Sequence, residues 1–359
     1  MCESDQLFHG ISAMKASILF ITYQHEAFIA EAIRSAMAQD YPDLELVLCD
    51  DGSTDRTRSI LEKELESCPT HIEVLWASSE KNLGFHANFN RGLAACTGDV
   101  IIAMSGDDIS VPNRVSLICR EFAADLNCML VCSSWIRIDE FGNVISNKGI
   151  DLKHNKNRFF SYSISKDQIY AGAPVCGAVA AYRVELRELF PPMHKGPHGE
   201  DNCFWVRALL VGNIRYLSEP LVFWRSHESN QSNWSQEIEF TVAMARHLKF
   251  LRAHERMVRQ WMRDITQALE TKLIAQSAFE EYQTTARIKC EWHRLRRLSV
   301  TRALWKLWFS SAIKLLRASG SRKIFFRSCR RILRWHLPLM LSAKRREAYW
   351  RSNTGHSSV

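Results

Sequence analysis

The chain has 359 residues, 46% of them hydrophobic and 24% charged, so it has enough apolar material to bury a sizeable core. Its 11 cysteines are scattered without a CxxC pair, which argues against a disulfide framework or a zinc site and indicates reduced thiols in the cytosol. The opening MCESDQLFHG lacks the apolar core of a signal peptide, and no apolar run reaches the ~18–20 residues of a spanning helix.

The net charge of +8 is distributed unevenly along the chain. Residues 285–351 contain 19 Lys or Arg against two acidic residues, a net charge of +17. The remainder carries 28 basic and 37 acidic residues, a net charge of −9. The chain therefore combines a mildly acidic body with a strongly basic C-terminal segment.

The N-terminal third alternates apolar, β-rich runs with stretches of helical periodicity. This alternation predicts an α/β fold: a mostly parallel, Rossmann-like sheet with right-handed crossovers and flanking helices. The expected strands are Ala16–Tyr23, Leu44–Asp51, Ile72–Ser78 and Asp99–Ser105.

The rest of the body is less regular. MLVCSSWIRIDEFGNVI predicts a strand, a turn and a returning strand, and residues 147–170 are expected to form a loop. GEDNCFWVRALLVG, Gly199–Gly212, has helical periodicity. From about Ser235 to Ala278 the apolar spacing predicts one long helix, whole or broken, as part of a helical C-terminal appendage.

Polar pairs stand where three of the expected strands end, at Thr22-Tyr23, Asp50-Asp51 and Asp107-Asp108. Asp107 and Asp108 allow two interpretations. One of them can cap the helix that VPNRVSLICREF predicts. Alternatively they hold a divalent cation, since adjacent carboxylates are unfavourable unless a positive charge compensates them. Ligands of parallel sheets bind beyond the carboxyl ends of the strands, so the shared placement favours a site.

Five motifs follow one another in the chain: SILFITYQHEAFIAEAIRSAMAQDYPDLELVLCDDGSTDRT, NLGFHANFNRGL, TGDVIIAMSGDDISVP, GEDNCFW and RSHESNQS. In this order and at this spacing they strongly resemble glycosyltransferase family 2, over roughly residues 17–232. The resemblance implies a GT-A fold and an inverting transfer of a sugar from a nucleotide-sugar, with a UDP-sugar as the expected donor.

The resemblance makes Asp107 the expected ligand of Mn²⁺ or Mg²⁺, with His227 as a further ligand and Asp108 as a donor-binding residue. A divalent cation stabilises a departing diphosphate as a Lewis acid, and oxygen ligands suit both ions. A purely structural role is the alternative for His227.

The resemblance also predicts how the nucleotide is held. Asp51 is expected to accept a hydrogen bond from the uracil ring, while Asp50 and Asp51 can divide that role with capping of the GSTD turn. The loop at Asn82 and Gly84 is expected near the ribose and diphosphate, or is a simple turn before a helix. The expected nucleotide-binding residues are Thr22, Tyr23, Asp50, Asp51, Asn82 and Gly84.

An inverting transfer needs a base for the proton of the acceptor hydroxyl, and by resemblance this base is Asp201. Partial burial and the neighbouring Glu200 would raise its pKa toward neutrality, where a carboxylate base works best. Alternatively, both acids merely complement a helix N-terminus. Glu200 and Trp205 are weaker candidates for acceptor contacts, and Trp205 is otherwise a core residue.

The sequence departs from the family pattern at two positions. Ser105 occupies the first acidic place of the Asp-x-Asp motif, and Phe89 stands where many members have Arg or Lys before Asn90. The QxxRW signature of the processive polymerases is absent, so a single-addition enzyme is expected.

The basic segment interleaves Lys and Arg with Trp, Phe, Leu and Ile, as in TRALWKLWFSSAIKLL. Basic amphipathic helices with Trp at the boundary bind anionic membrane surfaces, so we expect residues 285–351 to do so. The alternatives are packing on the body and nucleic-acid binding, which the apolar stripes disfavour. No nucleic-acid partner is expected.

Together these patterns predict an N-terminal lead (1–14), a GT-A domain (15–234), a long helical segment (235–284) and a basic tail (285–359). The expected function is sugar transfer to a glycan or lipid-linked glycan in surface polysaccharide synthesis, at the cytoplasmic face of the membrane. An inactive nucleotide-sugar-binding or membrane scaffold protein is the alternative. A nucleotidyltransferase is disfavoured because no GxGTR-like loop follows the first strand, and a dehydrogenase because GxGxxG is absent.

Overall fold

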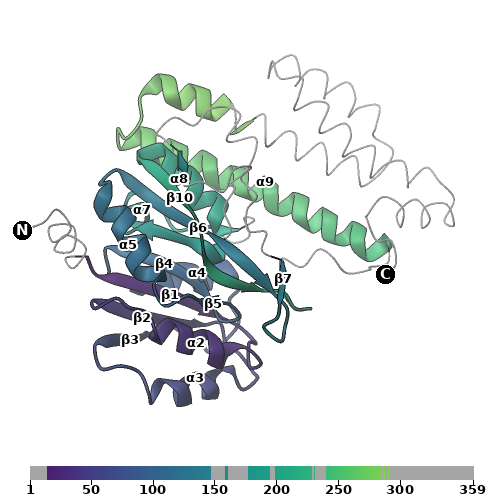
Figure 1. The fold of residues 1–359 in the computed structure, drawn as a ribbon. Helices are drawn as coiled ribbons and strands as arrows, with labels where there is room; N and C mark the ends of the chain where they lie inside the picture. Colours follow the sequence, from purple (N-terminus) through teal and green to yellow (C-terminus); the bar gives the residue numbers. More distant parts are fainter. Residues whose placement is uncertain are drawn as a thin grey trace, which may run out of the picture.

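A mixed sheet forms the centre of the computed structural model (Figure 1). The structure describes residues 14–146, 158–160, 177–194, 199–228, 230, 240–284, 286–287 and 290. The expected N-terminal lead, most of the loop at 147–170 and nearly all of the basic tail lie outside these residues.

The sheet has the strand order β3-β2-β1-β4-β9-β6-β10-β5, with β7 on β6 and β8 on β10. β1 to β4 pair in parallel, and β9 runs antiparallel to both β4 and β6. The expected mostly parallel α/β sheet is therefore confirmed. The strands are β1 (Ala16–Thr22), β2 (Leu44–Asp50), β3 (Ile72–Trp76), β4 (Val100–Ser105), β5 (Ile109–Ser110), β6 (Cys128–Ile138), β7 (Val144–Ser146), β8 (Arg158–Phe160), β9 (Ala180–Arg183) and β10 (Asn213–Arg225).

Helices cover both faces of this sheet because its central strands are apolar on both sides. In β1, Leu19 faces one core, whereas Ile18 and Phe20 face the other. The core around Leu19 contains α4, α8 and α9, and the opposite core contains α2, α3 and α5. The helices are α2 (Ile29–Met37), α3 (Thr57–Leu65), α4 (Phe85–Ala95), α5 (Arg114–Ala124), α7 (Glu185–Leu189), α8 (Glu200–Val211) and α9 (Phe240–Glu270), with a short 3-10 turn η1 (Gly177–Val179).

The long C-terminal helix α9 packs beside α8 (Figure 1). Its apolar residues Val258, Trp261 and Ile265 belong to the same core as the sheet. The helix ends at Glu270, and Lys272 has a φ of +60°, so the long helical segment is broken before residue 276. Among the described helices, none is both long and apolar enough to cross a bilayer.

Two local expectations need correction. A short strand, β8, lies at residues 158–160, inside the segment expected to be a loop. Asp107 and Asp108 do not cap a helix, because β5 intervenes and α5 begins only at Arg114 with Asn113 as its N-cap residue. The helix-start interpretation of the acidic pair is thereby excluded.

Candidate active site

The carboxyl ends of β1, β2 and β4 bring the expected site segments to one edge of the sheet. Thr22 pairs with Asp50 across β1 and β2, and Ile21 pairs with Ser105 across β1 and β4. The acidic segments 50–51 and 105–108 therefore flank the end of β1. This is the edge at which ligands of open α/β sheets bind.

Asp107 is the centre of a polar cluster at this edge. Its Oδ2 lies 3.0 Å from Nε2 of His227 and accepts a hydrogen bond from Nδ2 of Asn230 at 3.1 Å. The hydroxyl of Ser105 donates to Oδ1, so the residue that departs from the acidic motif positions Asp107. Burial raises the pKa of Asp107, but the hydrogen bonds from His227 and Ser105 outweigh it and hold the pKa below its usual value.

His25 joins this cluster and was not among the residues predicted from the sequence. Its Nε2 lies 3.9 Å from the same Oδ2 of Asp107, and its Nδ1 lies 3.2 Å from the hydroxyl oxygen of Thr22. Burial lowers the pKa of His25, so the ring is neutral at pH 7. Its position just after a strand end was the available signal.

Asp108 faces away from this cluster. It is buried, and its Oδ1 accepts a hydrogen bond from the backbone N–H of Arg225 at 2.9 Å. Burial and the charge of Asp107 raise the pKa of Asp108 well above its usual value. Asp108 therefore anchors the 105–108 turn to β10, and donor binding by its side chain stays a prediction.

Asp50 and Asp51, at the end of β2, accept hydrogen bonds from different segments of the chain. Asp50 caps the following turn by accepting from the backbone N–H (3.1 Å) and the hydroxyl (2.5 Å) of Ser53. Asp51 accepts from the backbone N–H groups of Leu83 and Gly84, each at 2.9 Å. Each Asp51 oxygen keeps a further lone pair, so base recognition by Asp51 stays a prediction.

The remaining nucleotide candidates differ in exposure. Tyr23 is 40% exposed, which leaves its ring available to a planar base. Thr22 is buried, and its side chain contacts His25, so it supports the site from behind. Asn82 accepts from the backbone N–H of Gly84, whose φ of +88° suits glycine. The 82–84 segment is thus an ordered turn fixed by Asp51.

Glu200 and Asp201 begin helix α8. Burial and the neighbouring Asp201 raise the pKa of Glu200 to about 8, and burial raises the pKa of Asp201 to about 6. Glu200 packs against Gly177, where an added Cβ would lie 1.8 Å from its Oε1. The guanidinium of Arg114 donates hydrogen bonds to the backbone oxygen of Ala178, the residue after Gly177, and to that of Ala103 in β4. η1 therefore connects the start of α8 to the edge of the sheet that carries the site.

Two other candidates belong to the core. Trp205 is 4% exposed and packs in the same apolar cluster as Phe204, so its surroundings are those of the core residue and give its stacking on an acceptor no support. Phe89 is also fully buried, with its ring centroid 5.7 Å from that of Phe204. The position that carries Arg or Lys in many relatives therefore serves packing here. Glu200 is buried as well, so acceptor contact is unsupported for its side chain.

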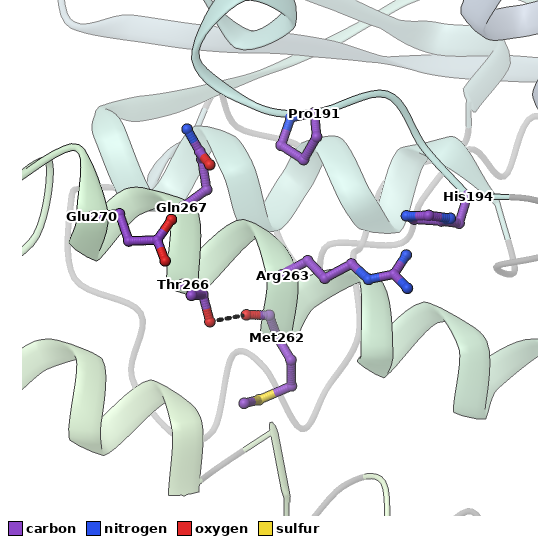
Figure 2. A pocket seen from close by; sticks show the side chains of 7 residues that line it. All are labelled: Pro191, His194, Met262, Arg263, Thr266, Gln267 and Glu270. Atoms are coloured by element: carbon purple, nitrogen blue, oxygen red, sulfur yellow. Dashed lines mark hydrogen bonds between the residues drawn. The ribbon is translucent and has the colours of Figure 1, made fainter.

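A pocket of about 390 Å³ lies apart from these residues, between α9 and the segment before α8 (Figure 2). Figure 2 shows Arg263 directed toward His194 at one end and Glu270 at the other. None of the candidate site residues lines it. Its lining consists of Pro191, His194, Met262, Arg263, Thr266, Gln267 and Glu270.

The cluster around Asp107 fits a divalent cation shared with a diphosphate. Nε2 of His227 and Oδ2 of Asp107 lie 3.0 Å apart and share a proton; two neighbouring ligands about 2.1 Å from an octahedral ion have about the same separation, so a cation would replace that proton. Within the described residues, no group of three or more His, Cys, Asp or Glu side chains forms a complete metal cage. Two protein ligands suffice for Mg²⁺-type sites, because substrate phosphates and water supply the others.

The curled, mostly parallel sheet flanked by helices is a GT-A-type fold. The solved structure of S. aureus TarS in complex with UDP-GlcNAc has this fold: it matches with a TM-score of 0.57 and 18% identity, covering 95% of this chain and 88% of that one. At this identity the likeness concerns the fold alone.

Sequence comparisons identify the family. Residues 17–190 match the family model described as Glycosyl transferase family 2. An uncharacterized glycosyltransferase of Nostoc sp. is 28% identical over 224 residues, 60% of this chain and 66% of the relative. The chondroitin synthase of Escherichia coli is 37% identical over 131 residues, 36% of this chain and 18% of the synthase. Over residues 17–190 the chain thus matches glycosyltransferase family 2.

A third relative has a more specific name. The UDP-Gal:alpha-D-GlcNAc-diphosphoundecaprenol beta-1,3-galactosyltransferase of Escherichia coli is 28% identical over 206 residues, 55% of this chain and 69% of that enzyme. The chain thus matches between about a fifth and two thirds of the length of these three relatives.

Proposed function

We propose that the protein transfers a sugar from a UDP-sugar to a hydroxyl of a glycan or lipid-linked glycan, with inversion, in the presence of Mn²⁺ or Mg²⁺. The observation that carries this proposal is the contact between Asp107 and His227. Residues 120 positions apart in sequence meet at the ligand-binding edge of the sheet, 3.0 Å apart. Such a pair has no need to be assembled there for folding alone, because Asp108 and Arg225 already join the two segments.

In this proposal Asp107 and His227 hold the cation, and His25 and Asn230 surround the same carboxylate oxygen. A bound divalent cation would neutralise the charge that develops on the departing diphosphate. The neutral ring of His25 adds no charge to this site, and Ser105 fixes the Asp107 carboxylate. These residues therefore keep one carboxylate available to the cation, which in turn would bind the anionic diphosphate.

The nucleotide would lie between the ends of β1 and β2. Tyr23 supplies an exposed ring, and Asp51 has a lone pair for the uracil imide. The turn at Gly52 packs on the 81–82 backbone, where an added Cβ would approach Lys81 to 2.7 Å. This close packing holds the two nucleotide-binding loops in one arrangement.

Asp201 is the proposed base. A pKa of about 6 leaves it largely ionised at pH 7 yet basic enough to take a proton as the acceptor attacks. Glu200, with a pKa of about 8, is protonated under the same conditions. The pair then carries a single negative charge, which assigns proton acceptance to Asp201.

The acceptor class is inferred from the relatives. One of them is named for a diphosphoundecaprenol-linked acceptor, which suits a protein working at a membrane surface. The basic segment at 285–351 would provide peripheral attachment to anionic lipid on the cytoplasmic face. This attachment would place the active site near a lipid-linked acceptor.

A donor panel tests the proposal. Purified protein is incubated with UDP-galactose, UDP-N-acetylglucosamine, UDP-glucose and GDP-mannose, with Mn²⁺ or with chelator. Transfer of the sugar to water is followed through the nucleoside diphosphate that is released. We expect one UDP-sugar to be consumed in the presence of Mn²⁺ and spared with chelator. Turnover that persists in chelator would contradict the metal requirement, and no turnover of any donor by folded protein would contradict the activity.

A further inference from the structure

The side chain of Asp201 is held by its neighbour in the first turn of α8. The backbone N–H of Asn202 donates to Oδ1 of Asp201 at 2.7 Å, and the side-chain amide of Asn202 donates to the same oxygen at 2.9 Å. Among the described residues, both hydrogen bonds of this carboxylate fall on Oδ1. Oδ2 is therefore the oxygen left to receive a proton.

Glycine is required directly before this turn. Gly199 has a φ of +68°, and an added Cβ would lie 2.1 Å from Oδ1 of Asp201. The carboxylate thus folds back over a residue without a side chain. Gly199 and Asn202 together fix one orientation of the Asp201 side chain.

Helix α9, which lies beyond the family match, holds Asn202 in turn. The indole N–H of Trp261 donates to the backbone oxygen of Asn202 at 3.1 Å, and Trp261 is 1% exposed. One residue earlier, the side-chain oxygen of Gln260 accepts from the backbone N–H of His194 at 3.0 Å. Neighbouring residues of α9 therefore contact both sides of the segment that leads into α8.

The titratable groups near Asp201 are either neutral or paired with an opposite charge. Glu200 beside it has a pKa of about 8 and is protonated near pH 7. Burial raises the pKa of the Cys203 thiol, so this group is also neutral. Asp264 of α9 is paired with Arg207 of α8 through hydrogen bonds of 2.9 and 3.0 Å. No unpaired charge among these groups competes with Asn202 in stabilising the ionised form.

We propose that Asn202 is a positioning residue for the base Asp201, and that Trp261 of α9 keeps Asn202 in place. This inference rests on the proposed function, since it takes Asp201 as the base. The amide orients the carboxylate through Oδ1 and favours its charged form. It acts against burial, which raises the pKa of Asp201, and so keeps the base ionised at neutral pH.

The test is the pH profile of UDP release, with the UDP-sugar that the donor panel identifies. Asn202→Ala removes one of two hydrogen bonds to the ionised carboxylate, so the acid limb of kcat/KM should move up by about one pH unit. Relative to the unmodified protein, the rate should fall about fivefold at pH 6 and stay within about threefold at pH 8.5. Trp261→Phe should shift the limb in the same direction by less.

Three further variants make the outcome decisive. Asn202→Gln keeps an amide, so its acid limb should lie between those of Asn202→Ala and the unmodified protein. Thr266→Val on α9 should leave the pH profile unchanged, because the Thr266 hydroxyl donates to the backbone oxygen of Met262 in its own helix. Binding of UDP by calorimetry should be the same for all of them. An equal loss at every pH in Asn202→Ala would overturn the positioning role. Normal turnover by Asp201→Asn would instead overturn the choice of base.

Discussion

Two adjacent carboxyls at the start of α8 behave differently because their surroundings differ. Asp201 accepts two hydrogen bonds from Asn202, whereas Glu200 packs against Gly177. Burial and the charge of Asp201 both raise the pKa of Glu200. The result is a base with a pKa of about 6 beside an acid with a pKa of about 8. Pairs whose environments separate their pKa values in this way are typical of acid–base sites.

Replacing the base should abolish transfer while leaving the nucleotide site intact. Asp201→Asn keeps the shape of the side chain but cannot take a proton, so kcat for UDP release should fall by about 10²–10⁴-fold. The affinity for UDP should change less than about twofold, because Asp201 lies on α8 and not on the nucleotide-binding loops. Steady-state kinetics and UDP calorimetry on the same preparation check both statements. A variant that loses UDP binding together with turnover would contradict the assignment.

Glu200 should make stability depend on pH. Its pKa in the folded protein, about 8, lies above the ordinary value of 4.5, so the folded state favours the protonated form. The contribution of protonated Glu200 to the free energy of unfolding is fully present below about pH 4.5 and is lost as the pH rises through about 8. Glu200→Gln should therefore raise Tm relative to the unmodified protein at pH 8.5, by about 2 °C or more, with a gap that narrows toward pH 5. Thermal unfolding at the two pH values measures this, and a gap independent of pH would refute it.

At the scale of elements, α8 and α9 are joined by a fully buried ion pair. Arg207 and Asp264 are 1% and 0% exposed, and Gln260 donates a further hydrogen bond to Asp264 at 2.9 Å. Arg207 also donates to the backbone oxygen of Pro191 at 2.6 Å. The same contacts therefore fix α9, α8 and the segment that precedes α8.

Breaking this pair should destabilise the protein strongly. Asp264→Ala leaves the Arg207 guanidinium buried without its counter-charge, which costs about 3–5 kcal/mol. The double variant Arg207→Met with Asp264→Leu removes both charges and should recover most of that loss. Urea unfolding measures the two values. A single variant as stable as the double variant would show that the pair is dispensable.

The strands that carry the site could be predicted because their composition is decisive. β1, β2 and β4 are buried on both faces and mostly apolar, with Ser17 and Glu45 as buried polar exceptions, and each ends in a polar residue at the same edge. The short elements β5 and β8 were missed, since two or three residues carry no periodicity of their own. They exist because β10 offers partners to both.

Side-chain orientation was harder to predict than the position of the motifs. Asp107 and Asp108 are identical neighbours in sequence, yet one faces His227 and the other the backbone of Arg225. The difference arises from β10, more than 100 residues away. His25 was missed for a similar reason: only the folded chain shows that its ring reaches Asp107. Local sequence thus located the acidic turn, and long-range contacts decided which carboxyl serves the site.

At the scale of the whole molecule, the body and the basic segment join beyond α9. Tyr282 and Ala286 are buried in the core that contains α8 and α9, so the body extends at least to these residues. A truncation that removes the basic segment without damaging the core should therefore end at Cys290, where the described residues end.

The membrane prediction can be tested with that truncation. The full chain should float with vesicles of phosphatidylglycerol and phosphatidylcholine at 0.1 M salt, and the chain ending at Cys290 should not. Binding of the full chain should weaken at 0.5 M salt or on phosphatidylcholine alone, since the attraction is partly electrostatic. Equal flotation of both chains would place the membrane contact, if there is one, on the body.

Calorimetric titration of UDP into the full chain, with Mn²⁺ and with chelator, is the most direct test of a cation site at Asp107 and His227. We expect Mn²⁺-dependent binding that is weakened at least tenfold in both Asp107→Ala and His227→Ala. Glu62→Ala, which removes an exposed carboxylate of α3 paired with Arg58, is the matched control and should bind as the unmodified protein does. Binding that ignores Mn²⁺, or that survives in both site variants, would contradict a cation site at Asp107 and His227.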